Sequence, residues 1–294
     1  MFICNLCPRN CNVTRKALTD NGKGFCLMGE NPVVARAALH YWEEPVISGN
    51  KGSGTIFFSG CNLQCVYCQN EEISRGNTGK EITVDRLREI YFELIKKGAH
   101  NINLVTGTHF INSICQSLEA PLPVPVVYNC GGYESISSLK LLDGKIDIYL
   151  PDLKYSDNNL GKKYSKADNY FETATKAILE MYRQVGNYEI DDNGIMKKGV
   201  IIRHLVLPGC LKNTKGVIDW VKNNFKPGEV LFSLMSQFTP VKGCNKDSLT
   251  RRLTQEEYDE VADYLFKSGI EDGFMQELSS AKEEYIPPFN LEGV

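Results

Sequence analysis

Three cysteines stand close together in the sequence, Cys61, Cys65 and Cys68, with the spacing C-x3-C-x2-C. They directly follow an apolar run at 55–58 and the pair Ser59-Gly60. Three thiolates at this spacing can hold one face of a compact 4Fe-4S cluster, whose fourth iron then lacks a protein ligand. An open metal position is where a small molecule can bind and react. The spacing therefore predicts a reactive cluster directly after a strand.

A structural zinc site is the alternative for these cysteines. Zinc in such sites prefers four ligands and a closed tetrahedral geometry. After Cys68 the next histidine is His100 and the next cysteine is Cys115, so no fourth ligand stands near the array. The array therefore favours the cluster with an open iron.

The first thirty residues hold a second array, in which Cys4, Cys7, Cys11 and Cys26 follow the spacing C-x2-C-x3-C-x14-C. This segment has too little apolar content to bury a core, so a bound metal would supply its folding free energy. Four grouped cysteines satisfy either a tetrahedral zinc ion or a fully ligated iron–sulfur cluster. The spacing leaves both alternatives open.

Length and composition are those of an ordinary globular protein. The 294 residues suffice for one large α/β domain with attachments or for two small domains, and 42% of them are apolar. With 33 basic and 36 acidic residues the net charge is −3, so no global field draws the chain to nucleic acid or anionic lipid. No apolar run approaches the roughly 18 residues of a membrane span. We therefore expect neither a nucleic-acid partner nor a membrane partner.

The start of the chain and its cysteines indicate the cytoplasm. The first residues, Met1-Phe2-Ile3-Cys4, lack the basic-then-apolar layout of a signal peptide. Eleven cysteines in an exported chain would indicate disulfides, but seven of the eleven belong to the two tight arrays. Reduced thiols that bind metal are the better interpretation, and we expect a cytoplasmic protein.

Strands and helices are predicted to alternate through the middle of the chain. The expected strands are 55–58, 101–105, 124–128, 146–150, 200–207 and 230–234, and the expected helices are 83–97, 134–142, 169–185 and 214–224. This alternation predicts a parallel sheet with right-handed crossovers. A further helix begins at the capping box Thr254-x-x-Glu257 and ends at Gly269, and an irregular strap follows.

Polar residues follow several of these strands. In barrels of parallel strands the functional groups gather at the carboxyl ends. Thr106 to His109 follow the second strand and Asn129 follows the third. Asp152 and Lys154 follow the fourth strand, with their side chains on the same side. We expect these residues to lie near the cysteine loop.

Four further residues that can carry a charge are expected in other parts of the fold. Arg203 is a charge inside an apolar strand, and a buried cation needs a partner. His204 alternates to the opposite face, where we expect it to pack against a helix. Glu43 and Glu44 lie in the stretch His40-Tyr41-Trp42-Glu43-Glu44-Pro45, where an acid pair beside a histidine could transfer protons. A polar surface or linker is the favoured interpretation of this stretch.

The cysteine motif and its context resemble the radical S-adenosylmethionine (SAM) superfamily. The best match is an uncharacterised branch homologous to pyruvate formate-lyase activating enzyme. That branch is similar in its Cys-x-x-Cys-Pro-Arg-x-Cys start, its H-Y-W-E-E-P bridge and its Phe-Ser-Gly-Cys-Asn-Leu-Gln-Cys loop. The resemblance implies an α/β fold: a partial (β/α)6 barrel at 51–240, a Cys-rich metal-binding extension and bridge at 1–50, and a C-terminal helix and strap at 241–294.

The resemblance also implies a chemistry. In the superfamily, SAM binds the open iron of the 4Fe-4S cluster, and one electron cleaves a C–S bond to give a 5′-deoxyadenosyl radical. An electron donor such as flavodoxin or ferredoxin is implied as a partner. A protein or peptide substrate is the sharpest hypothesis, as in activation of a glycyl radical enzyme. Radical chemistry on a small molecule is the alternative, and a non-catalytic zinc-binding interaction module is a distant one.

The resemblance carries over to several SAM contacts. Tyr67 is the aromatic residue that precedes the third cysteine in the superfamily motif. Asp152 and Lys154 match a D-x-K beside the SAM carboxylate, Asn129 stands where an acid or amide is found, and Arg203 matches an arginine that serves SAM. The superfamily usually has a Gly-Gly-Glu-like stretch after its second strand, and this chain departs from it. The residues found there are implied as SAM contacts, with His109 as a SAM or substrate contact: Thr106, Gly107, Thr108 and His109.

Overall fold

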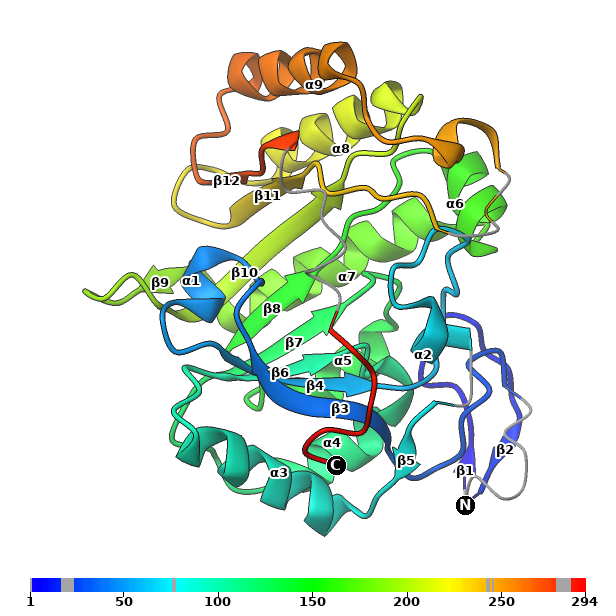
Figure 1. The fold of residues 1–294 in the computed structure, drawn as a ribbon, viewed down its shortest axis with the longest axis vertical. Helices are drawn as coiled ribbons and strands as arrows, with labels where there is room; N and C mark the ends of the chain where they lie inside the picture. Colours follow the sequence, from blue (N-terminus) through cyan, green and yellow to red (C-terminus); the bar gives the residue numbers. More distant parts are fainter. Residues whose placement is uncertain (1, 17–23, 76–77, 242–243, 245, 279–286) are drawn as a thin grey trace.

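The computed structural model describes residues 2–16, 24–75, 78–241, 244, 246–278 and 287–294 (Figure 1). Its centre is a sheet of parallel strands, which are neighbours in this order: β4 (Ser53–Phe58), β6 (Ile102–Val105), β7 (Val126–Cys130), β8 (Ile148–Pro151), β10 (Met196–Leu205) and β11 (Leu231–Met235). Apolar runs buried on both faces are typical of parallel strands, which explains why the strands were predictable. The six predicted strands and the partial (β/α)6 barrel are confirmed.

Short strands extend this sheet and the N-terminal segment. β12 (Gly273–Met275) pairs parallel with β11, β5 (Lys80–Glu81) pairs with β3 (Val33–His40), and β9 (Glu189–Ile190) pairs with β10. Near the N-terminus, β1 (Phe2–Ile3) and β2 (Thr14–Arg15) form a separate two-stranded sheet.

The strand β3 lies in the stretch that was predicted to be a bridge. It pairs antiparallel with β4 along most of its length, from Val34 opposite Phe58 to His40 opposite Ser53. Its sequence is rich in alanine, which is depleted in strands, so sequence propensity did not reveal it. The bridge is therefore part of the sheet.

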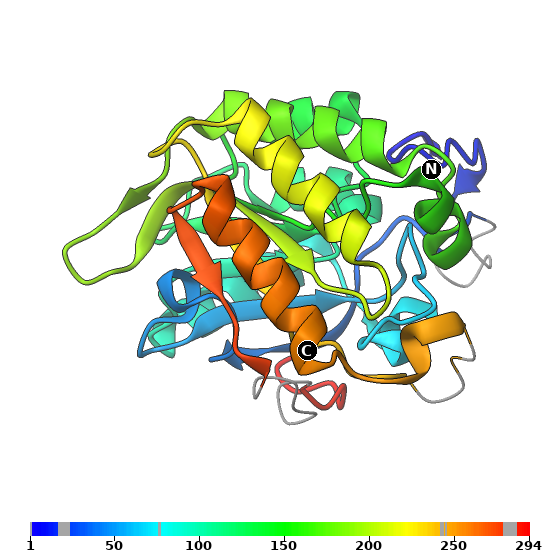
Figure 2. The same ribbon diagram turned by 90° about the horizontal axis from the view of Figure 1, so that it is seen from above.

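Helices cover one face of the sheet, as Figures 1 and 2 show for α4, α5, α7 and α8. The helices are α1 (Pro45–Ser48), α2 (Glu71–Arg75), α3 (Val84–Lys96), α4 (Ile111–Ser117), α5 (Ile136–Leu142), α6 (Asn158–Ser165), α7 (Tyr170–Val185), α8 (Leu211–Asn224) and α9 (Gln255–Ser268), with 3-10 turns η2 (Thr108–Phe110) and η3 (Asp247–Thr250). None of the described helices is long and apolar enough to cross a membrane.

Local capping signals set the helix ends, and those of α9 are the ones predicted. Thr83 caps α3 by accepting a hydrogen bond from the backbone of Arg86. Thr254 and Glu257 form both bonds of the capping box of α9. Gly269 ends α9 in the left-handed conformation, at φ +80°, which glycine adopts at little cost.

The short helix α1 packs against the opposite face of the sheet. Val46 and Ile47 pack against a buried cluster on the sheet that includes Val127, Leu150 and Ile201. The contact is apolar and buried, so it holds α1 and the residues that precede it inside the open side of the barrel. This placement decides which side chains reach the interior.

The C-terminal strap, residues 287–294, lies along β3. The backbone N–H of Ala37 donates to the carbonyl of Glu292 at 2.8 Å, and that of Leu291 donates to the carbonyl of Ala35 at 3.1 Å. A Cβ at Gly293 would stand 2.0 Å from the carbonyl oxygen of Ala37, so only glycine fits. The strap therefore pairs with an otherwise exposed strand edge.

Candidate active site

One cavity collects charged and polar side chains from neighbouring strand ends. It has a volume of about 220 Å³ and extends from the loop of Cys65 and Cys68 to Glu43 and Glu44, which precede α1. The predicted SAM contacts that line it are Tyr67, Asn129, Asp152, Lys154 and Arg203.

The register of the sheet explains why these residues meet. Asp152 and Arg203 form an isolated parallel bridge just beyond β8. The backbone N–H of Leu153 also donates to the carbonyl of Arg203 at 2.8 Å. Paired residues of a ladder point to the same face of the sheet. Asn129 lies near the end of β7, the strand next to β8, so its side chain joins the same group.

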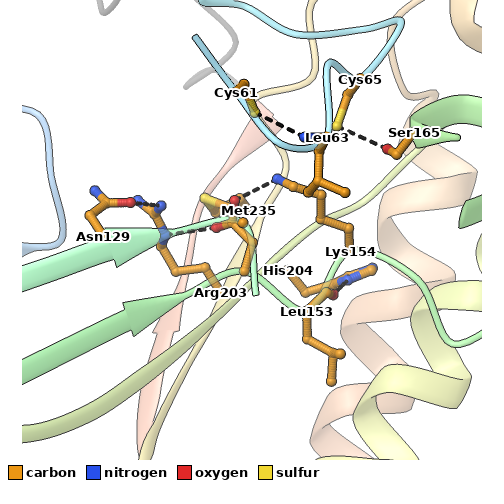
Figure 3. A network of polar contacts seen from close by, with 12 residues as sticks. Cys61, Leu63, Cys65, Asn129, Leu153, Lys154, Ser165, Arg203, His204 and Met235 are labelled. Carbon is orange, nitrogen blue, oxygen red and sulfur yellow. Dashed lines mark hydrogen bonds and ion pairs between the residues drawn. The ribbon is translucent and has the colours of Figure 1, made fainter. Parts of the chain in front are cut away.

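A hydrogen-bond network centres on Arg203 (Figure 3). One of its terminal nitrogens donates to Asn129 at 2.6 Å, as Figure 3 shows. Its Nε–H donates to Asp152 at 3.0 Å, and its other terminal nitrogen donates to Glu43 at 3.1 Å. Lys154 Nζ donates to the second oxygen of Asp152 at 2.5 Å. A buried cation needs such partners. In this arrangement Arg203 acts as a positioning residue, and its contact with SAM stays a prediction.

The charges in this network shift one another's pKa values. Burial alone would raise the pKa of Asp152, but the charges of Arg203 and Lys154 outweigh it and hold the pKa below its usual value. Burial alone would lower the pKa of Lys154, but Asp152 outweighs it and raises the pKa. The pair is therefore ionised, with the ammonium group at the wall of the cavity.

The cysteine loop is shaped by a glycine and by hydrogen bonds to sulfur. Gly60 has φ +81°, and a Cβ there would stand 2.7 Å from the carbonyl oxygen of Cys26. The backbone N–H of Leu63 donates to Cys61 Sγ at 3.3 Å, and the Ser165 hydroxyl donates to Cys65 Sγ at 2.9 Å (Figure 3). Such bonds to sulfur are among the features that tune iron–sulfur clusters.

The donor set fits a cluster that carries one thiolate on each of three irons. Burial, together with the neighbouring Cys65 and Cys68, raises the pKa of Cys61 to about 12. Thiols that crowd together in this way release their protons when they bind a metal. Among the described residues, no three Cys, His, Asp or Glu side chains converge on a single metal ion. Ligands of a four-iron cluster bind different irons and need no such convergence.

Tyr67 lines the cavity and also packs against the residues that support the cysteine loop. Its side chain is buried, and its hydroxyl lies 2.8 Å from the hydroxyl of Tyr155. Its ring packs edge-on against Tyr155 and Tyr164. The aromatic residue before the third cysteine is therefore a packing anchor for the loop.

The expectation that Glu43 and Glu44 lie on a polar surface or linker is wrong. Their side chains are only 9% and 6% exposed, respectively. Glu43 accepts hydrogen bonds from Arg203 at 3.1 Å and from Asn129 at 3.2 Å. The reason is the packing of α1 into the barrel, which no local pattern revealed. The only signal in the sequence was that the two acids are followed, after Pro45, by the apolar pair Val46 and Ile47.

The stretch from Thr106 to His109 does not reach the cavity. His109 is buried and its Nε2–H donates to the carbonyl of Ser59 at 2.7 Å. Burial, together with the nearby Arg15, lowers the pKa of His109 to about 3. A Cβ on Gly107 would stand 2.5 Å from Ile114, so this glycine packs against α4. Their contact with SAM stays a prediction that the geometry does not support.

Glu134 is a buried acid that the sequence analysis missed. It accepts hydrogen bonds from Thr108 Oγ1 at 2.6 Å and from the Tyr128 hydroxyl at 3.2 Å. Burial raises its pKa to about 7, although these two hydrogen bonds act against the rise. The carboxyl group of Glu134, which follows β7, thus binds the turn that follows the neighbouring strand β6. No spacing pattern in the sequence links the two.

The N-terminal cysteine segment packs directly on the cysteine loop. Arg9 Nε donates to the carbonyl of Asn62 at 2.7 Å, and Gln64 Nε2 donates to the carbonyl of Phe25 at 2.7 Å. Within the segment, the buried Arg15 donates to Cys26 Sγ at 3.0 Å. The two arrays, which are separate in the sequence, are therefore neighbours in space.

His204 packs against α8, as predicted. It is fully buried, its Nδ1–H donates to the carbonyl of Leu153 at 2.6 Å, and its Nε2 lies 3.0 Å from Thr214 Oγ1. Burial lowers its pKa to about 4, so the ring is neutral near neutral pH. Its role is to hold β10 against the helix and the strand end of β8.

Comparison with known proteins identifies the class to which this chain belongs. Residues 55–209 match the Radical SAM superfamily. Over 279 residues the chain is 32% identical to an uncharacterized protein of Methanocaldococcus jannaschii, and the match covers 91% of this chain and 75% of the other. The chain therefore belongs to the radical SAM superfamily, and the predicted resemblance is confirmed. The superfamily implies a 4Fe-4S cluster and SAM.

Solved structures with a similar fold are known. SuiB of Streptococcus suis, bound to its precursor peptide SuiA, matches with a TM-score of 0.53 and 14% identity, over 76% of this chain and 48% of SuiB. The hydrogenase maturase HydG matches with a TM-score of 0.51 and 13% identity, over 77% of this chain and 52% of HydG. The chain thus spans about half the length of these proteins. At such identities the likeness concerns the fold.

Proposed function

We propose that this chain is a radical SAM enzyme that reductively cleaves SAM, with a 4Fe-4S cluster held by Cys61, Cys65 and Cys68. The observation that carries the proposal is that the cysteine loop and the Asp152–Lys154 pair line the same cavity. When bound, the cluster supplies the electron that cleaves the C–S bond of SAM. Membership of the superfamily supports this chemistry.

The chain's own residues would bind and orient SAM. Lys154 presents a buried ammonium group beside the loop, where it can pair with the SAM carboxylate. Asp152 holds the ammonium group in place, and Arg203 holds Asp152 in place. The side chains of Lys154, Asp152 and Arg203 are only 19%, 15% and 14% exposed, so their charges interact more strongly than they would at the surface.

For the substrate, we propose a protein or peptide from which hydrogen is abstracted, as in the activating enzymes of glycyl radical enzymes. A small-molecule substrate is the alternative. An electron donor of the flavodoxin or ferredoxin type would supply the reductant.

We further propose that the N-terminal cysteines bind a second metal site. Cys4 and Cys26 both lie beside Arg15, and Cys7 lies within electrostatic range of both. Four grouped cysteines suit either a fully ligated iron–sulfur cluster or a tetrahedral zinc ion, and the two alternatives differ in the metal that the protein would contain. Because this segment contacts the cysteine loop, a cluster here would be placed to pass electrons to it.

Spectroscopy of the reconstituted protein tests the function. After anaerobic reconstitution with iron and sulfide, we expect a reducible cluster whose EPR spectrum changes when SAM is added, with slow formation of 5′-deoxyadenosine. S-adenosylhomocysteine, which lacks the sulfonium group, is the control and should give no 5′-deoxyadenosine. A reduced cluster whose spectrum is the same with and without SAM would contradict the proposal.

Metal analysis tests the second site. In a variant with Cys4→Ala and Cys7→Ala, we expect the iron and sulfide content to fall by roughly half, because one of two clusters loses its ligands. A variant with Cys115→Ala and Cys210→Ala, two cysteines outside both arrays, is the control and should keep its iron. Loss of zinc instead of iron would establish the zinc alternative, and an unchanged metal content would show that the segment binds none.

A further inference from the structure

We propose that Glu43 and Glu44 form a recognition site for a positively charged nitrogen group of the substrate, a primary ammonium or a guanidinium. The site is the wall of the active-site cavity away from the cysteine loop. This inference rests on the proposed function, since it names the substrate chemistry of the same cavity. It is carried by the burial, the charge balance and the hydrogen bonds of the described residues around the two acids.

The contacts run in series from the cysteine loop to the acid pair. Lys154 lies within electrostatic range of Cys68 and binds Asp152, Asp152 binds Arg203, and Arg203 binds Glu43. SAM is therefore expected to bind at the end of the cavity where Lys154 lies. The acid pair stands at the other end, where a substrate rather than SAM would be bound.

The cavity wall holds one carboxylate in excess. The acids are Glu43, Glu44 and Asp152, and the cations are Lys154 and Arg203, so three carboxyl groups face two positive charges. Of the other described residues that line this cavity, only His40 could carry a positive charge, and burial and Arg36 lower its pKa to about 4, so it is neutral near neutral pH. Acidic side chains are rarely buried without a partner for each charge. Burial raises the pKa of Glu44, and a cation bound beside it would favour the ionised form and complete the balance of charges.

Glu44 is the acid that lacks a full set of partners. Its Oε2 is buried and has no hydrogen-bond partner among the described residues. The nearest cation is Arg203, at 4.0 Å from this oxygen, which is beyond hydrogen-bond distance. Its carboxyl group is otherwise bound by the Ser233 hydroxyl. A buried acceptor left without a donor costs about 1–3 kcal/mol, so a ligand that donates there is favoured.

A purely structural role does not account for both acids. Anchoring Arg203 requires one carboxylate on this side, and Glu43 fills that role at 3.1 Å. Glu44 lies 4.0 Å from Arg203, too far for a hydrogen bond, yet this residue lines the cavity. Binding of Arg203 therefore does not explain why Glu44 is buried here, and a second role is needed for it.

A second cavity reaches the same acids from outside. Its volume is about 400 Å³, and it shares Trp42, Glu43 and Glu44 with the first cavity. At its lining, Tyr41 is 50% exposed and Trp42 is 58% exposed. Aromatic faces attract ammonium and guanidinium groups. A cationic group entering here would pass two aromatic side chains and then meet Glu44.

The test measures binding to the anaerobic holoenzyme with SAM bound and no reductant. The probes are n-butylammonium and n-butylguanidinium, with neutral n-butanol as the isostere without charge, and the method is isothermal titration calorimetry. Peptide probes, acetyl-Ala-Lys-Ala-amide and acetyl-Ala-Arg-Ala-amide with a norleucine control, distinguish a peptide source of the cation from a small amine. We expect the cationic probes to bind more tightly than the neutral ones.

The variants are chosen to isolate Glu44. Glu44→Gln removes the charge and keeps the shape, and we expect it to weaken the cationic probes about 10- to 100-fold. Glu44→Asp keeps the charge and should lose less affinity. Glu189→Gln, an exposed acid on β9, is the matched control and should leave the affinity unchanged. Iron and sulfide content report whether each variant is folded and loaded.

Several outcomes would overturn the inference. These are equal binding of n-butanol and n-butylammonium, absence of binding to the wild type, competition between the amine and SAM, and unchanged affinity in loaded Glu44→Gln. Because the comparison between probes uses the wild type, it holds even where a variant does not fold. A wild type that shows no EPR response to SAM would instead reject the proposed function, so the two failures are distinguishable.

Discussion

Replacement of Cys65 by alanine is expected to abolish formation of 5′-deoxyadenosine. Cys65 is one of three thiols on the loop after β4, and it lines the cavity that holds Lys154. With only two cysteines left on this loop, two irons of the cluster would lack a protein ligand instead of one. We expect such a cluster to be lost or unable to bind SAM productively. We expect less than about a hundredth of the wild-type product in a single-turnover assay. The iron content should fall together with the product.

Cys130→Ala is the matched control for this prediction. Cys130 is buried near the end of β7, belongs to neither cysteine array and does not line the cavity. We expect this variant to keep its cluster and its product. Persistent SAM cleavage in Cys65→Ala would remove the assignment of the loop as the site of the cluster.

Replacement of Arg203 by methionine is expected to destabilise the fold by about 3–5 kcal/mol, because it leaves buried carboxylates without their cation. Arg203 binds Asp152, Asn129 and Glu43, and its side chain is only 14% exposed. Methionine fills a similar volume but donates no hydrogen bond. The free energy of unfolding, measured by urea titration of the variant and the wild type, tests this expectation.

The loss should depend on pH. Burial raises the pKa of Glu43 and of Glu44, whereas the charge of Arg203 lowers both. Without Arg203 both pKa values rise further above the ordinary value of 4.5. The folded state then binds more protons than the unfolded state, so stability falls as pH rises. We expect a larger deficit at about pH 8 than at about pH 5.

Arg183→Met is the control for a loss of charge at the surface. Arg183 pairs with Asp143 and Glu180, and its side chain is 56% exposed. Exposed pairs contribute little, so we expect a much smaller change. An equal loss in the two variants, or a deficit of Arg203→Met that grows toward acid pH, would contradict the role given to Arg203.

Features that depend on near neighbours in the chain could be predicted from the sequence. The spacing of Cys61, Cys65 and Cys68 already selects a cluster loop, because ligands on one short loop need no long-range contact to come together. The six parallel strands could be predicted because their apolar runs must be buried on both faces. Asp152 and Lys154 could be placed because the carboxyl ends of parallel strands lie at one edge.

Tertiary packing alone decided what surrounds these residues. Glu43 and Glu44 are inside the barrel because Val46 and Ile47 pack against β7, β8 and β10, far along the chain. The turn from Thr106 to His109 is directed away from the cavity because His109 bonds Ser59 and Thr108 bonds Glu134. Burial and pairing between distant segments depend on many long-range contacts, and no local sequence pattern encodes these contacts. For that reason the sequence revealed the cluster loop, and only the fold revealed the acid pair opposite it.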